Sequence, residues 1–191
     1  MVDPALARFL GVSVGTILLV ASGAKVLGKG ISAEAFLRDV GVPRWASQPL
    51  VRTVTGVEGV LGAALVSGLA PIPSSAAATG LFLLFVIAQV QHARRGGRTG
   101  CKCFGALDAH MPSYVALWRV VVLTAVAAAT LSLFLFVPGD GGMGAGALPA
   151  VLGALFGVAT LSSFAHAAAI AGFLRSVRLA REALQSPAVP E

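Results

Sequence analysis

The sequence predicts an all-α fold, a polytopic bundle of transmembrane helices with four core helices and a fifth C-terminal span. Of its 191 residues, 57% are hydrophobic and 12% are charged, whereas soluble domains average about 25% charged residues. The apolar residues gather in stretches of roughly 20, the length that crosses a hydrocarbon core of about 30 Å. These stretches lack the alternation of barrel strands, and lipid requires backbone groups to be satisfied internally, so helices are expected.

Hydropathy divides the chain into five spans and a polar tail. The first span has few positive residues before it and exceeds a typical signal-peptide core, so a membrane helix is favoured over a cleaved signal peptide. The third is short, and alanines and nearby glutamines extend it. The expected spans are 5–27, 50–70, 75–90, 114–137 and 148–174. The corresponding divisions are a four-helix membrane domain (1–137), a glycine-rich linker (138–147), an additional transmembrane helix (148–175) and a polar tail (176–191).

The first connection, residues 31–48, has a pattern of its own. Ala35, Phe36 and Val40 share one helical face, and Gly41-Val42-Pro43 then interrupts it. The pattern predicts a short helix lying in the membrane interface, with a solvated loop as the alternative.

The loop charges alternate in a way that predicts topology. The second and fourth connections, 69–75 and 138–146, contain no Lys or Arg. Because positive loops prefer the cytoplasm, we expect the N-terminus outside and the C-terminus inside a membrane such as the bacterial cytoplasmic membrane. The same bias explains the net charge of +6 without nucleic-acid binding, which would need aromatic residues among the cations. The cations flanking the other connections and the tail are Lys29, Arg38, Arg44 and Arg52, then Arg94, Arg95, Arg98 and Lys102, then Arg175, Arg178 and Arg181.

Five polar side chains fall inside the predicted spans. Successive spans alternate direction, so all five are expected in the half of the membrane nearest the third connection. Lys25 and Glu58 are expected to form an ion pair, with Arg119 as a second cation on the same carboxylate. A pair that only fixes helix order, or cations that snorkel to the interface, are the alternatives. The five residues are Lys25, Glu58, Arg119 and two candidates for ligand binding, Gln89 and His166. For His166, a hydrogen-bonded core histidine is favoured over a ligand or proton-transfer role.

The only two cysteines, Cys101 and Cys103, are one residue apart in the basic, glycine-rich third connection. Arg98 and Lys102 should favour the thiolate and so lower the pKa of at least one thiol. A disulfide across one intervening residue closes a tight ring that is easily reduced. The pair is therefore the predicted catalytic site of thiol–disulfide exchange, with a reduced, unreactive pair in the cytosol as the alternative.

A metal site is the weaker interpretation of the same segment. Cys101, Cys103 and His110, with His92 and Met111 nearby, suit a soft ion such as Cu(I) or Zn. Because no second cysteine pair or regular histidine spacing completes a tetrahedral site, we expect no metal.

Residues 5–135 resemble the family of the methylamine utilisation protein MauE and its DoxX-like relatives. The resemblance rests on Ala21-Ser-Gly-Ala-Lys25, Val57-Glu58, the element Cys101-x-Cys103-Phe-Gly105 and Trp118-Arg119. It implies a four-helix membrane protein associated with thiol redox, and a part in maturing the disulfide-rich small subunit of methylamine dehydrogenase. The extra fifth span and the inside position predicted for the cysteines depart from that pattern.

These features together predict a membrane thiol–disulfide redox component that exchanges with a thioredoxin-like or other redox partner. The polar cluster of Lys25, Glu58 and Arg119 would lie beneath the cysteines and bind a quinone or a small anionic ligand. Quinone-coupled disulfide oxidases such as DsbB and vitamin K epoxide reductase are analogous, although the second cysteine pair that relays electrons is absent here. The alternative is a non-enzymatic membrane subunit, either a scaffold or a binder of metal or small solutes, so the sequence leaves open whether the protein is an enzyme.

Overall fold

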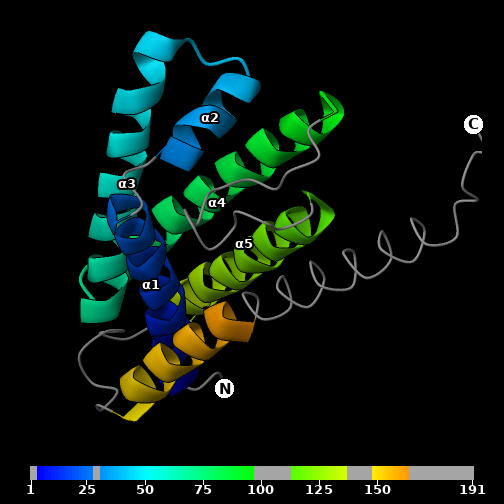
Figure 1. Ribbon diagram of the computed structural model, residues 1–191. Coiled ribbons are helices and arrows are strands. Elements are labelled where there is room, and N and C mark those ends of the chain that lie inside the picture. The colour runs from blue at the N-terminus through cyan, green and yellow to red at the C-terminus, as the bar shows by residue number, and fades with distance from the viewer. Residues whose placement is uncertain (1–3, 28–30, 97–112, 137–147, 164–191) are drawn as a thin grey trace, which may run out of the picture.

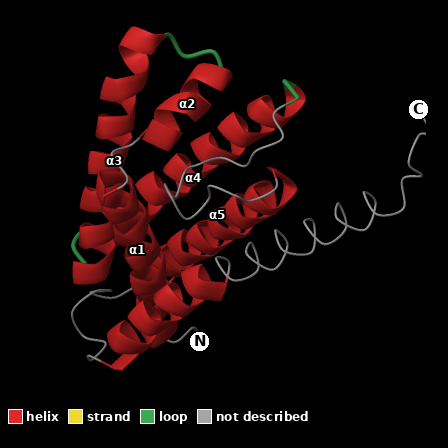
Figure 2. Ribbon diagram, viewed as in Figure 1, coloured by secondary structure: helices red, strands yellow, loops and turns green. Residues whose placement is uncertain are grey.

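The computed structural model describes residues 4–27, 31–96, 113–136 and 148–163. Its labelled helices are α1 (Pro4–Leu27), α2 (Ile31–Asp39), α3 (Arg44–Ser67), α4 (Pro71–Arg94) and α5 (Ser113–Phe136), and a further helix covers Leu148–Ser163 (Figure 1). The described part of the chain consists of helices, with short turns between α2 and α3 and between α3 and α4 (Figure 2).

Four of these helices, α1, α3, α4 and α5, are long and apolar enough to cross a membrane. Their outer faces carry exposed aliphatic side chains, among them Val60, Leu84 and Ile87. A soluble protein rarely exposes so continuous an apolar surface, so the surrounding medium is lipid. The predicted all-α membrane bundle is confirmed. The Leu148–Ser163 helix covers the first part of the expected fifth span, whose remainder lies outside the described residues.

Helix bounds differ from the hydropathy-based spans at the polar ends. α3 begins at Arg44 instead of residue 50, and α4 extends to both sides of the expected 75–90. Hydropathy marks only the apolar section, whereas a helix continues into the headgroup region where polar side chains are solvated. Pro71 can start α4 because the first helical residue needs no N–H partner and its fixed φ suits the helix.

α2 confirms the short helix expected in the first connection. Gly41 ends it with a φ of 102°, a left-handed conformation that glycine adopts without steric cost. The N–H of Val42 donates to the carbonyl of Leu37, and that of Gly41 donates to the carbonyl of Arg38. These two bonds form a Schellman motif, so the glycine break works by satisfying the last carbonyls of the helix.

α1 and α3 pack antiparallel through glycines. A Cβ added at Gly15 would lie 2.8 Å from the carbonyl oxygen of Gly62, and the reverse distance is also 2.8 Å. Farther along, the hydroxyl of Ser22 donates to the carbonyl of Thr55 over 3.0 Å. The small-residue faces expected on these two helices therefore serve close backbone approach, the common mode of helix association in lipid.

The remaining helices complete the bundle around α1. α4 and α5 lie side by side and antiparallel (Figure 1). The Leu148–Ser163 helix packs on the other side of α1, where the Ser13 hydroxyl donates to the Gly153 carbonyl over 3.0 Å. The central apolar cluster is formed by Val14, Ile17, Leu18, Ala21, Phe36, Leu65, Ala78, Leu81, Phe82, Leu123, Ala127 and Leu161.

One end of the bundle collects the features that matter for function. It carries the last turn of α1, all of α2, the first turns of α3 and α5, and the last turn of α4. Arg95, which follows α4, donates from Nη1 to the carbonyl of Asp39 at the end of α2 over 3.4 Å. We call this the α2 end. The segment with the cysteines joins α4 to α5 at this end in the sequence.

Candidate functional site

Lys25 and Glu58 form an ion pair inside the bundle. Lys25 lies in the last turn of α1, and Nζ contacts Oε1 of Glu58 on the antiparallel α3. The exposed fractions of the two side chains are 4% and 1%. Nζ also lies 5.3 Å from the centre of the Phe85 ring on α4, a cation–π geometry. The expected pairing is thus present, and three helices enclose it.

Arg119 does not complete the triad expected around Glu58. Oε2 of Glu58 is buried and accepts no hydrogen bond from the described residues. Among those residues, Lys25 is the cation that forms an ion pair with Glu58. Arg119 is itself buried in α5 and has its own interactions. The sequence predicts a shared depth for these residues, but depth does not fix the rotation of α5 about its axis.

Buried polar side chains also mark the ends of α4 and α5 that adjoin the cysteine segment. Gln89, His92 and Arg119 are exposed by 0%, 3% and 2%, respectively. The His92 ring stacks on Phe36 of α2 with centroids 5.0 Å apart and an interplanar angle of 53°. This contact fixes α2 over α4. Each of the three polar side chains makes interactions within the protein, as burial in lipid requires.

Several predicted site residues lie outside the described part of the chain. They are Cys101, Cys103, His110, Met111 and His166. The catalytic pair and the metal alternative therefore remain predictions. Within the described residues, no group of three His, Cys, Asp or Glu side chains could hold a metal ion.

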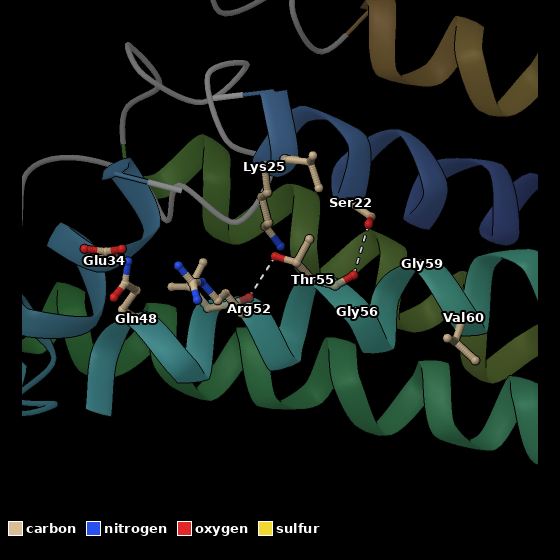
Figure 3. A pocket seen from close by; sticks show the side chains of 11 residues that line it. Ser22, Lys25, Glu34, Gln48, Arg52, Thr55, Gly56, Gly59 and Val60 are labelled. Atoms are coloured by element: carbon tan, nitrogen blue, oxygen red, sulfur yellow. Dashed lines mark hydrogen bonds between the residues drawn. The ribbon is translucent and has the colours of Figure 1, made fainter. Parts of the chain in front are cut away.

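Two cavities at the α2 end meet at Lys25. The larger, about 780 Å³, lies between α1, α2 and α3 (Figure 3). Figure 3 shows Glu34, Gln48 and Arg52 gathered toward one end of it and Val60 at the other. The smaller, about 210 Å³, has mainly apolar walls that include Phe36 and Phe85. The larger cavity is lined by Ser22, Lys25, Val26, Glu34, Gln48, Val51, Arg52, Thr55, Gly56, Gly59 and Val60.

Sequence reasoning missed part of this arrangement. Phe85 was not singled out, although it lies four residues before Gln89 and so shares its helical face. Gln48, Arg52 and Thr55 likewise follow one another at helical spacing on α3. That polar stripe on a membrane helix is the signal in the sequence that indicates a cavity.

Comparison with known proteins gives one family. The model of a family described as methylamine utilisation protein MauE matches residues 3–134. The match covers α1 to α4 and nearly all of α5, and it ends before the Leu148–Ser163 helix. No curated protein and no solved structure matches the chain.

Proposed function

The chain belongs to the MauE family of methylamine utilisation proteins, and from this membership we propose that it is a membrane thiol–disulfide redox component that uses Cys101 and Cys103. It is an integral membrane protein with four apolar helices long enough to span the bilayer. The cysteine pair lies within the matched residues. The proposal assigns the chemistry to that pair and a supporting role to the buried polar groups at the α2 end.

The proposed reaction is exchange between two dithiol–disulfide couples. A thiolate of the reduced partner attacks one sulfur of the Cys101–Cys103 disulfide, and the other cysteine leaves as a thiolate. The second partner thiol then resolves the mixed disulfide. The partner is oxidised, Cys101 and Cys103 are reduced, and two electrons and two protons have moved to the membrane protein.

The observation that carries the proposal is the burial of Gln89, His92 and Arg119 at the helix ends joined by the cysteine segment. Polar side chains inside a membrane are costly and usually mark functional positions. Three at one junction, with Lys25 and Glu58 at the same end, favour chemistry there over simple helix packing.

A membrane quinone is the acceptor class that we propose for renewing the disulfide. It would take up two electrons and two protons from the cysteine dithiol and become a quinol. The smaller cavity supports this, because Phe36 and Phe85 supply aromatic walls for a quinone ring. The cavity opens at the α2 end, where the cysteine segment begins and ends in the sequence.

The proposed partner is a thioredoxin-like protein on the side that the cysteines face. Maturation of a disulfide-rich subunit, as the family's link to methylamine utilisation suggests, would then proceed through such a carrier.

Trapping of mixed disulfides tests the proposal. The variants Cys101→Ser and Cys103→Ser would each be incubated with the oxidised form of a thioredoxin-like protein and analysed on non-reducing gels. The remaining thiolate then attacks the partner's disulfide, which is the reverse of the proposed exchange. We expect one single variant to accumulate a covalent complex, because the resolving thiol is missing, and the double variant to form none. Arg44→Gln, which changes an exposed cation of α3 and keeps both thiols, is the matched control and should behave as the parent.

The opposite result would favour the non-enzymatic alternative. If neither single variant forms a complex and the parent exchanges no thiols, the redox proposal is wrong. The larger cavity would then favour a subunit that binds a small solute.

A further inference from the structure

The larger cavity carries charges of both signs on facing walls. Arg52 projects from α3, and Glu34 projects from α2. Among the described residues, neither Arg52 nor Glu34 forms an ion pair with the other or with a third residue. Lys25, which also lines the cavity, is already held by Glu58. The cavity therefore offers one guanidinium and one carboxylate to an occupant, with the Gln48 amide beside them (Figure 3).

Aromatic residues show where this cavity lies in the bilayer. The two tryptophans and the tyrosine of the chain are Trp45, Trp118 and Tyr114, and their exposed fractions are 83%, 67% and 69%. All three lie in the first two turns of α3 or α5 and therefore at the α2 end. Exposed Trp and Tyr mark the headgroup level of a membrane.

Arg52 lies just inside that level. It follows Trp45 by seven positions on one helix, so it lies about 10 Å deeper at a rise of roughly 1.5 Å per residue. A long Arg side chain at this depth extends toward the headgroups, and Figure 3 shows Arg52 on the side of Gln48 and Glu34. The polar end of the cavity thus faces the headgroup layer.

The other end of the cavity suits an acyl chain. Gly56 and Gly59 leave a shallow wall on α3, because a Cβ at Gly56 would meet no atom within 4 Å. Val26 and Val60 flank this wall with exposed fractions of 67% and 70%. A hydrocarbon chain could follow this surface toward the middle of the bilayer.

We propose that the cavity binds a membrane lipid whose headgroup carries a phosphate and a primary ammonium, as phosphoethanolamine does. Arg52 donates to the phosphate, Glu34 and Gln48 accept from the ammonium, and one acyl chain lies over Gly56, Gly59 and Val60. A phosphoglycerol headgroup offers Glu34 neutral hydroxyl groups and no cation, and a phosphocholine headgroup has no N–H to donate. The lipid site uses Arg52, Glu34 and Gln48, which take no part in the thiol chemistry proposed above, although Lys25 lines both cavities.

Native mass spectrometry of the full chain released from detergent micelles tests this site. The protein would be titrated with phosphatidylethanolamine, phosphatidylglycerol or phosphatidylcholine of the same acyl chains. We expect tightest binding of one phosphatidylethanolamine. Arg52→Gln should weaken that binding roughly tenfold, as expected when a charge-assisted hydrogen bond is lost. Glu34→Gln should remove the preference over phosphatidylglycerol.

Arg44→Gln is the control, because it removes an exposed cation from the same helix outside the cavity lining. It should bind as the parent does. Equal affinity of the parent for all three lipids, or unchanged binding by Arg52→Gln, would overturn the proposal. Water-soluble phosphoethanolamine at the same concentration should not displace the lipid, and displacement would remove the acyl-chain part of the site.

Discussion

At the scale of single residues, the Lys25–Glu58 pair is the most constrained feature of the molecule. Two charges are enclosed by α1, α3 and the Phe85 ring, with little exposure to the surroundings. A buried pair need not add stability compared with apolar residues, but removing one partner leaves an uncompensated charge. Comparing single and double substitutions of the pair can therefore distinguish a structural role from a functional one.

Glu58→Gln and Lys25→Met should each destabilise the protein by about 3–5 kcal/mol, and the double variant should recover most of that loss. Thermal unfolding in detergent measures the stability, with Arg44→Met as an exposed control that should change little. Single variants as stable as the parent would mean that the two side chains do not interact. A double variant that is stable yet inactive in thiol exchange would assign the pair to the function.

A second residue-scale prediction concerns the thiols. Arg98 and Lys102 flank the two cysteines, so one of the two thiols should react with an alkylating reagent well below the pKa of about 8.5 that a free thiol has. Arg98→Gln should move the midpoint of the rate profile to higher pH, because a cation that favours the thiolate is lost. Arg44→Gln should leave it unchanged. Midpoints at or above the free-thiol value in the parent would remove the electrostatic argument for reactivity.

At the scale of helices, close backbone contact between α1 and α3 positions the ion pair. Gly15 and Gly62 face each other with no room for a side chain. Any increase in volume there should move the helices apart and shift Lys25 relative to Glu58. Gly80 on α4 offers the matched comparison, since a Cβ there would meet no atom within 4 Å.

Gly15→Ala should destabilise the protein by about 1–3 kcal/mol through overpacking. Gly80→Ala should be neutral or stabilising by about 0.5–1 kcal/mol, because alanine loses less backbone entropy in a helix. Thermal unfolding of both variants in the same detergent provides the comparison. If the two substitutions had equal effects, the α1–α3 contact would not be as close as the structure shows.

At the scale of the whole molecule, charge and aromatic residues distinguish the two ends of the bundle. The α2 end carries Trp45, Tyr114 and Trp118 and most of the basic residues of the described chain, whereas the turn between α3 and α4 has no Lys or Arg. The positive-inside tendency predicts that the α2 end faces the cytoplasm.

Reporter fusions test this topology. Alkaline phosphatase fused after Leu69 should be active, because that turn is expected outside, whereas a fusion after Gly100 should be inactive. Green fluorescent protein at the same two sites should give the inverse pattern. An active phosphatase after Gly100 would place the cysteines outside and favour direct oxidation of exported proteins.

The family match also has a consequence for the architecture. It ends at residue 134, so the Leu148–Ser163 helix is an addition to the matched unit. That helix packs on α1 through Gly153 and Gly157, whose added Cβ atoms would lie 2.5 and 2.9 Å from α1 carbonyl oxygens. The Leu148–Ser163 helix therefore covers a face of α1 other than the Gly15 face that contacts α3.

The membrane class, the four core spans and the Lys25–Glu58 pairing follow from the amino-acid sequence. Span length and hydropathy are local properties of the sequence, and they must match the thickness and low polarity of the hydrocarbon core. The pairing followed because consecutive spans are antiparallel, so positions late in one and early in the next have similar depth. Gly41 ended α2 as expected because only local backbone geometry is involved.

Which side chains meet around that pair depends on how the helices pack. Lys25 lies over the Phe85 ring, Lys25 is the cation that the described residues pair with Glu58, and Arg52 and Glu34 line one cavity. These relations depend on how each helix is rotated about its axis and where the helices cross. Hydropathy carries little of that information in a bundle whose outer surface is as apolar as its core, because lipid does not distinguish one aliphatic face from another.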